Sequence, residues 1–267
     1  MDLAVEALMQ TGRQIAVILG PIAALSVALH QVDRILTNRI FSRLGWKGLL
    51  ATAWLGVPVH ELSHAIACKI FGHRIEKLSL FSPDRTTGKL GSVSHAWNKR
   101  NLYQQAGRFF IGLAPLAGGS AVLWLAAKSL GPPEAIHPAL LPGADLGTIV
   151  ASLGDQFEHL ARMLTRPEVL ASERTWIFLY LCLCVGAHLA PSPADLKGSF
   201  PGFLLLVLLV FGANLFALGT ETSTLSAEAA ALSVAAIALQ GLCLSLILCT
   251  ISALLVYLVT LPLPQRS

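Results

Sequence analysis

Long apolar runs dominate the hydrophobic pattern of this chain, and they predict membrane-spanning helices. A helix that crosses a bilayer needs about 20 consecutive residues that are mostly apolar. Six segments meet this requirement approximately: 14–32, 48–71, 109–130, 174–190, 200–219 and 229–261. The last is longer than one crossing needs, so we expect it to tilt, to project from the bilayer or to break near Gln240 and Gly241.

Between the second and third of these segments the pattern becomes polar. Two short runs with β-like character, at 77–81 and 90–97, are separated by turn-forming pairs at 83–84 and 87–88. This pattern predicts a β-hairpin. The expected fold is therefore mainly α, a polytopic membrane protein of about six transmembrane helices with a small β-hairpin between spans two and three.

A second polar stretch, residues 131–173, contains a helical pattern at about 147–164. With about 40 residues it is too short for an inserted peptide-binding domain. We expect three regions along the chain. Residues 1–47 form the first transmembrane helix and an amphipathic link, 48–198 form a membrane core, and 199–267 form two C-terminal transmembrane helices.

The composition supports a membrane protein. Hydrophobic residues make up 54% of the chain and charged residues 13%, with a mean hydropathy of +0.66, whereas soluble domains carry about 25% charged residues. The five cysteines lie in or beside apolar segments and form no CxxC pair, so we interpret them as buried free thiols. The N-terminal residues lack the basic stretch of a cleavable signal, so we expect the first span to be retained.

Lysine and arginine are concentrated within 72–108, at Lys197 and at the C-terminal end. Because cytoplasmic loops of membrane proteins carry an excess of these residues, we expect these parts and both termini on the cytoplasmic side of a multi-pass protein. The basic residues within 33–47 do not fit this arrangement, and an interfacial amphipathic helix there would account for them. The net charge of +4 needs no nucleic-acid partner to explain it.

The segment "VPVHELSHAIA" at 57–67 places ionisable residues inside an apolar run. His60 and His64 are four positions apart, so on a helix both rings project from one face and can bind one metal ion. Glu61 lies beside them, where a carboxylate can take a proton from a bound water. Ionisable residues within a span are costly and by default functional. The alternative is a hydrogen-bonded cluster that packs helices together.

A catalytic zinc site needs a third protein ligand. Asp195 is the candidate, because Pro191 and Pro193 interrupt the apolar run before it. Irregular backbone at membrane depth is tolerated only where it is buried within protein or lines a water-filled cavity, so a carboxylate just after such a break is well placed to meet the two histidines. The alternative is that Asp195 only caps a helix. His188 lies nearby and can be a ligand, a group that supports a ligand, or a substrate contact, and Glu76 fits a salt bridge better than a metal site.

Three elements in this order resemble the site-2 protease family of intramembrane zinc metalloproteases. They are "HELSH" within a span, "FIGLAPLAGG" at 110–119 and "HLAPSPADLKG" at 188–198, with the hairpin between the first two. The resemblance covers roughly residues 48–198. It identifies that region as the metalloprotease core of a divergent member.

The resemblance implies one Zn²⁺ per chain on His60, His64 and Asp195, with Glu61 as general base. It also implies an edge strand within 90–97 that binds an unwound stretch of substrate by strand addition. The residues that it suggests for substrate binding are His188, Ser92, Val93, Ser94 and His95.

The function expected from these features is an intramembrane endopeptidase that cuts membrane-spanning or membrane-tethered proteins within or near the lipid bilayer. Its partner would be a transmembrane protein substrate; without an inserted recognition domain, selection of the substrate would fall to the hairpin, the 131–173 segment or an adaptor protein. Two alternatives remain open: a non-catalytic, metal-stabilised membrane scaffold or adaptor, and an ion-coupled transporter. The presence of Glu61 favours the enzyme over the scaffold, because a purely structural metal site needs only the ligands. The spans show no inverted repeat of the kind that transporters use, which argues against the transporter.

Overall fold

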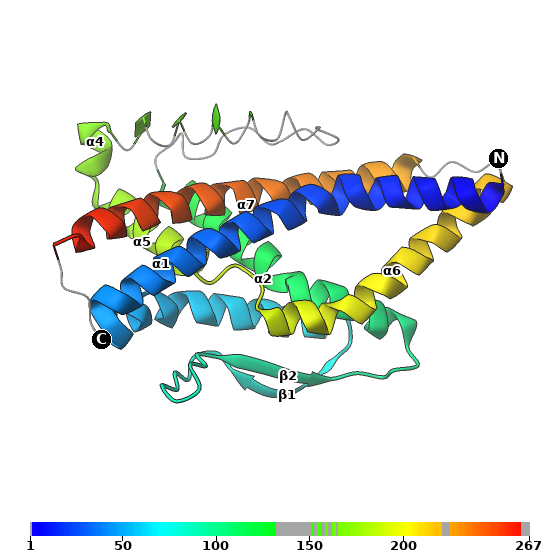
Figure 1. Cartoon of the computed structure of the whole chain (residues 1–267), viewed down its shortest axis with the longest axis horizontal. Helices are drawn as coiled ribbons and strands as arrows, with labels where there is room; N and C mark the ends of the chain where they lie inside the picture. Colours follow the sequence, from blue (N-terminus) through cyan, green and yellow to red (C-terminus); the bar gives the residue numbers. More distant parts are fainter. Residues whose placement is uncertain are drawn as a thin grey trace.

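The computed structural model of the chain describes residues 2–131, 165–220 and 225–262, together with 151, 154, 155, 158, 159, 162 and 163. The prediction of a mainly α fold with a small β-hairpin is confirmed (Figure 1). The elements in chain order are α1 Leu3–Ile70, β1 Arg74–Ser79, β2 Ser92–Ala96, α2 Leu102–Ser129, α4 Pro167–Leu170, α5 Glu173–Gly186, α6 Pro193–Gly219 and α7 Leu225–Thr260. The helical pattern predicted at 147–164 lies mostly outside the described residues.

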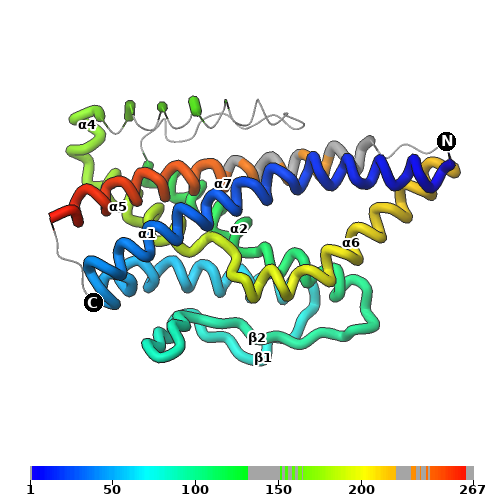
Figure 2. Tube along the Cα trace, in the orientation of Figure 1, coloured from blue at the N-terminus to red at the C-terminus, as the bar shows by residue number. Residues whose placement is uncertain are grey.

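Helix α1 consists of two arms joined at Gly45. Gly45 has φ 69° and ψ −161°, which is a backbone conformation that favours glycine, and the helical geometry stops there. The tube in Figure 2 shows the chain reversing at this point. The first arm runs beside α7, and the second arm returns below the first arm in this view. The second arm carries "HELSH", and the reversal places it next to α2 and the hairpin (Figure 1).

Among the residues that the structure describes, four helices are long and apolar enough to cross a membrane: α1, α2, α6 and the part Gly241–Thr260 of α7. The predicted count of six spans is not confirmed. The predicted spans 14–32 and 48–71 lie on the two arms of α1, and the span 174–190 corresponds to α5. Because α5 has 14 residues, its length of about 21 Å is short of a hydrocarbon core of about 30 Å.

Apolar side chains point outward along the long helices, as expected for a surface that meets lipid. Phe216 on α6 and Val259 on α7 are 69% and 72% exposed. Helix α7 is a single helix of 36 residues, so the break considered near its middle is not observed. The five cysteines are buried and free, as predicted.

The β-hairpin is antiparallel, and β1 is the only strand that pairs with β2 in the described part of the chain. Pairing runs from Arg74 opposite Ala96 to Ser79 opposite Ser92, with an irregularity between Ile75 and Lys77. The first strand begins three residues before the run predicted at 77–81, because α1 ends in a tight turn that leads directly into it. One edge of β2 therefore remains without a strand partner among the described residues.

Candidate metal centre

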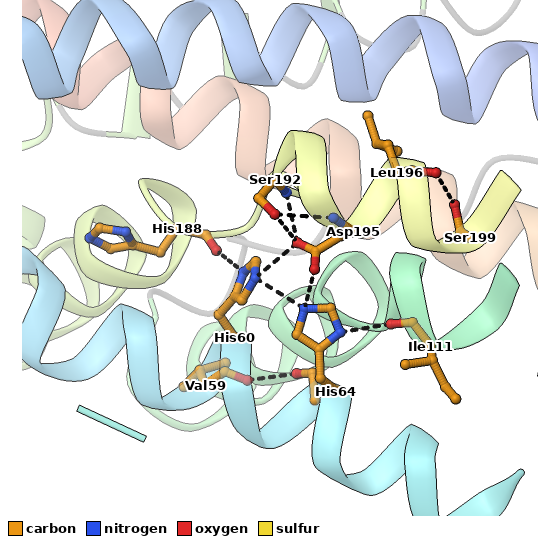
Figure 3. A network of polar contacts seen from close by, with 10 residues as sticks. Val59, His60, His64, Ile111, His188, Ser192, Asp195, Leu196 and Ser199 are labelled. Carbon is orange, nitrogen blue, oxygen red and sulfur yellow. Dashed lines mark hydrogen bonds and ion pairs between the residues drawn. The ribbon is translucent and has the colours of Figure 1, made fainter. Parts of the chain in front are cut away.

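His60 and His64 lie on the second arm of α1, one turn apart, and their Nε2 atoms approach to 3.2 Å (Figure 3). The Nδ1 atom of each ring faces a backbone carbonyl: His188 O lies 2.7 Å from His60 Nδ1, and Ile111 O lies 2.7 Å from His64 Nδ1. A carbonyl oxygen can only accept a hydrogen bond, so each Nδ1 carries the proton and donates. In the neutral rings both Nε2 lone pairs are then free and directed at each other.

Asp195 is the third member of this group. Its Oδ1 lies 3.4 Å from His64 Nε2, and its Oδ2 lies 3.6 Å from His60 Nε2. Helix α5 ends at Gly186 and α6 begins at Pro193, so the predicted interruption before Asp195 is present. The carboxylate also caps α6, because Ser192 donates from its backbone N and its hydroxyl to Asp195 Oδ2 at 2.8 and 2.6 Å. Capping and facing the histidines are thus two roles of one side chain.

The spacing of the three ligand atoms suits a metal ion. Bonds of about 2.0–2.2 Å at tetrahedral angles place the ligand atoms of zinc about 3.3–3.6 Å apart. The separations between Nε2 of His60, Nε2 of His64 and the Asp195 carboxylate oxygens are 3.2, 3.4 and 3.6 Å. When both rings are neutral, the two Nε2 atoms and the carboxylate are three electron-pair donors that repel one another, and a cation relieves this repulsion. His60, His64 and Asp195 can therefore hold a metal ion.

Glu61 lies beside this group. Its side chain is buried, with the residue 9% exposed, and it lines the same cavity as the two histidines. It lies against the backbone at the start of β2, since a Cβ atom placed on Gly91 would lie 2.8 Å from Glu61 Cγ and 3.0 Å from its Oε1. The absence of a side chain at Gly91 therefore leaves room for the Glu61 carboxylate next to the metal ligands.

A cavity of about 480 Å³ connects the candidate metal ligands to β2. Of the residues suggested for substrate binding, Ser92, Val93 and His95 line it, whereas Ser94 is exposed and does not. Burial lowers the pKa of His95, and the nearby His73, His64 and Arg108 lower it further, so its ring is neutral at neutral pH. The cavity thus joins candidate metal ligands, a carboxylate and one strand with an unpaired edge.

Of the three roles considered for His188, the structure favours support of a candidate ligand. Its backbone carbonyl orients His60, while its ring points away from the metal ligands (Figure 3). The ring packs against Gly56 of α1, where an added Cβ atom would lie 2.5 Å from His188 Cδ2. The ring does not line the cavity, so the residue supports a ligand through its backbone.

Several residues that build the site escaped the sequence analysis. Ile111 supplies a carbonyl to His64, and backbone atoms leave no trace in a sequence pattern. Gly112 lets α2 approach α6, since a Cβ atom there would lie 2.6 Å from Ser199 Cβ and 2.7 Å from Asp195 O. Ser192 did have a signal, because serine followed three residues later by an acidic residue is a capping pattern at a helix start.

No protein-family model, curated protein or solved structure matches this chain. A function for the site therefore has to be argued from its own residues and their geometry.

Proposed function

We propose that this protein is an intramembrane zinc metalloendopeptidase. The observation that carries the proposal is the convergence of three ligand atoms, from His60, His64 and Asp195, with Glu61 beside them in the wall of one cavity. Two nitrogen ligands and one carboxylate oxygen form a donor set that catalytic zinc sites use, with a further position left for water or substrate. The site lies on apolar helices that are long enough to cross a membrane.

Zinc, when bound, lowers the pKa of a water molecule and polarises the carbonyl of the bond to be cut. Glu61 would take a proton from a water molecule in the cavity as the water oxygen adds to the carbonyl carbon of the scissile bond. The same carboxyl then delivers the proton to the departing amide nitrogen, so that the C–N bond breaks to give an acid and an amine.

The substrate that fits the cavity is an extended peptide segment. A transmembrane helix hides its amides in internal hydrogen bonds, so a scissile bond has to be exposed by local unwinding. Strand β2 lines the cavity and has one edge without a strand partner among the described residues, which suits strand addition by the unwound segment. We therefore propose a membrane-spanning or membrane-tethered protein as the substrate.

The test compares Glu61→Gln with the unchanged protein, reconstituted in lipid with a single-span membrane protein as substrate. We expect Glu61→Gln to retain zinc and to lose at least about 100-fold in cleavage rate, because general acid–base catalysis contributes about 10²–10⁴-fold. The double variant His60→Ala, His64→Ala should lose both zinc from this site and cleavage. Glu76→Gln, an exposed carboxylate on β1, is the matched control and should cleave normally.

Full cleavage by Glu61→Gln would disprove the mechanism. A wild-type protein that binds zinc but cuts none of a panel of membrane proteins would favour the metal-stabilised scaffold.

A further inference from the structure

A second group of metal-binding side chains lies where the hairpin meets the end of α1. Cys68, His73 and His95 each offer one ligand atom, and these atoms lie within 4.8 Å of one another. Cys68 is fully buried and His73 is 3% exposed, while His95 is half-buried. Of the three, only His95 lines the cavity that holds Glu61, so the proposed peptidase chemistry leaves Cys68 and His73 unexplained.

Helical spacing places Cys68 in line with the first metal group. His60, His64 and Cys68 follow one another at intervals of four residues, so they project from the same face of α1. The thiol therefore lies one turn beyond His64, facing the hairpin and α2, and is packed among apolar side chains.

The turn that ends α1 brings His73 back over Cys68. Gly72 adopts a left-handed conformation with φ 69°, and the backbone N–H of His73 donates to the Cys68 carbonyl at 2.8 Å. The Gly72 N–H donates to the Lys69 carbonyl, which completes a Schellman motif. Ile75 lies two residues after His73 and pairs with His95 across the hairpin, which brings His95 close to His73.

The ring of His73 is oriented in the same way as the rings of His60 and His64. Its Nε2 lies 2.8 Å from the carbonyl oxygen of Gln104 and donates to it, which leaves the Nδ1 lone pair free. That Nδ1 points at Nδ1 of His95, 2.9 Å away. Trp97 stacks on the His73 ring, with 5.8 Å between the ring centroids, and restricts its movement.

We propose that Cys68, His73 and His95 form a second metal site, which binds zinc and fixes the hairpin to the end of α1. A thiolate with two imidazoles is a donor set that zinc prefers, and it differs from the first group in containing sulfur. The bound ion would link α1 to both strands of the hairpin at one end of the sheet, because His73 precedes β1 and His95 lies opposite Ile75 near the end of β2. The proposal does not depend on peptidase activity.

The presence of sulfur gives a direct test. Cobalt(II) bound by a thiolate has an intense near-ultraviolet absorption band, which imidazole and carboxylate ligands alone do not produce. We expect the purified full chain, stripped of metal and loaded with Co²⁺, to show this band. The double variant His60→Ala, His64→Ala should retain it, which separates this site from the proposed catalytic one.

Cys68→Ser should lose the band and about one zinc per chain, while Cys182→Ser, a fully buried cysteine on α5, should keep both. His95→Gln changes a half-buried position and serves as a second variant if Cys68→Ser does not fold; it should also lose about one zinc per chain. The proposal is overturned if the wild-type protein shows no thiolate band, or if the band persists in Cys68→Ser. The alternative is then that His95 simply donates a hydrogen bond to His73.

Discussion

The carbonyl oxygens of His188 and Ile111 set the chemistry of His60 and His64. Each carbonyl accepts a hydrogen bond from the Nδ1 of one ring, so the Nε2 of that ring keeps a free lone pair. The same arrangement recurs at His73 with the carbonyl of Gln104. Three rings oriented in this way by backbone oxygens are already in the tautomer that a metal needs, so binding requires no rearrangement of protons on them.

Asp195 depends on Ser192 for its orientation, and this dependence can be tested. The Ser192 hydroxyl donates to Asp195 Oδ2 and accepts from the Asp195 backbone N–H. We expect Ser192→Ala to weaken zinc binding by about 10–100-fold, because the groups that orient a ligand contribute this much to affinity. Competition with a chelator of known affinity measures the effect.

Ser199→Ala is the control for this variant. Ser199 is also on α6, but its hydroxyl donates only within the helix, to the Leu196 carbonyl. Equal zinc affinity in the two variants would show that the capping contact does not orient the carboxylate.

At the scale of the elements, the close approach of α2 and α6 brings Asp195 to the histidines. Gly112 has the Asp195 carbonyl and the Ser199 side chain where a Cβ atom would lie. We expect Gly112→Ala to force the helices apart, to lower the free energy of unfolding by about 1–3 kcal/mol and to reduce zinc binding. Thermal unfolding and zinc content of the purified protein measure both effects.

Gly212→Ala is the matched control, because a Cβ atom at Gly212 of α6 would meet nothing within 4 Å. It should leave zinc binding unchanged and can slightly stabilise the helix. Normal zinc content in Gly112→Ala would mean that Asp195 reaches the histidines without this close approach.

The sequence predicts the helical character, the hairpin and the pairing of His60 with His64, because each depends on local spacing. It also indicates Asp195, since Pro191 and Pro193 mark the interruption before it. It predicts two apolar spans joined by an amphipathic link, but it does not predict that this link continues the first helix as far as a sharp reversal at Gly45. The roles of backbone carbonyls are equally hidden, since every residue has one and only the tertiary structure selects among them.

At the scale of the whole molecule, α6 connects the candidate metal centre to the first arm of α1. It begins at the turn that carries Asp195, and near its other end the Asn214 side chain donates to Thr11 Oγ1 and Gln14 Oε1, both at 2.9 Å. These polar groups are buried. A hydrogen-bonded contact of this kind holds the two helices in one register, so the first arm of α1 takes part in positioning α6.

The side of the membrane on which the hairpin lies can be determined with one introduced cysteine. Ser82 is in the exposed loop between the strands, and all five native cysteines are buried. From the lysine and arginine distribution we expect Ser82→Cys to react with a membrane-impermeant thiol reagent in inverted vesicles but not in intact cells. The unchanged protein gives the background, and labelling of Ser82→Cys in intact cells would place the hairpin on the outer side.

The route of the chain through the site also has a consequence for its biosynthesis. Proteins are made from the N-terminus, so His60 and His64 enter the membrane long before Asp195 is synthesised. The carbonyls of Ile111 and His188 arrive in between, each fixing one ring. A nascent chain thus offers an ion only two ligands until α6 has started. Stable metal binding by all three residues would therefore require the chain to be completed past Asp195.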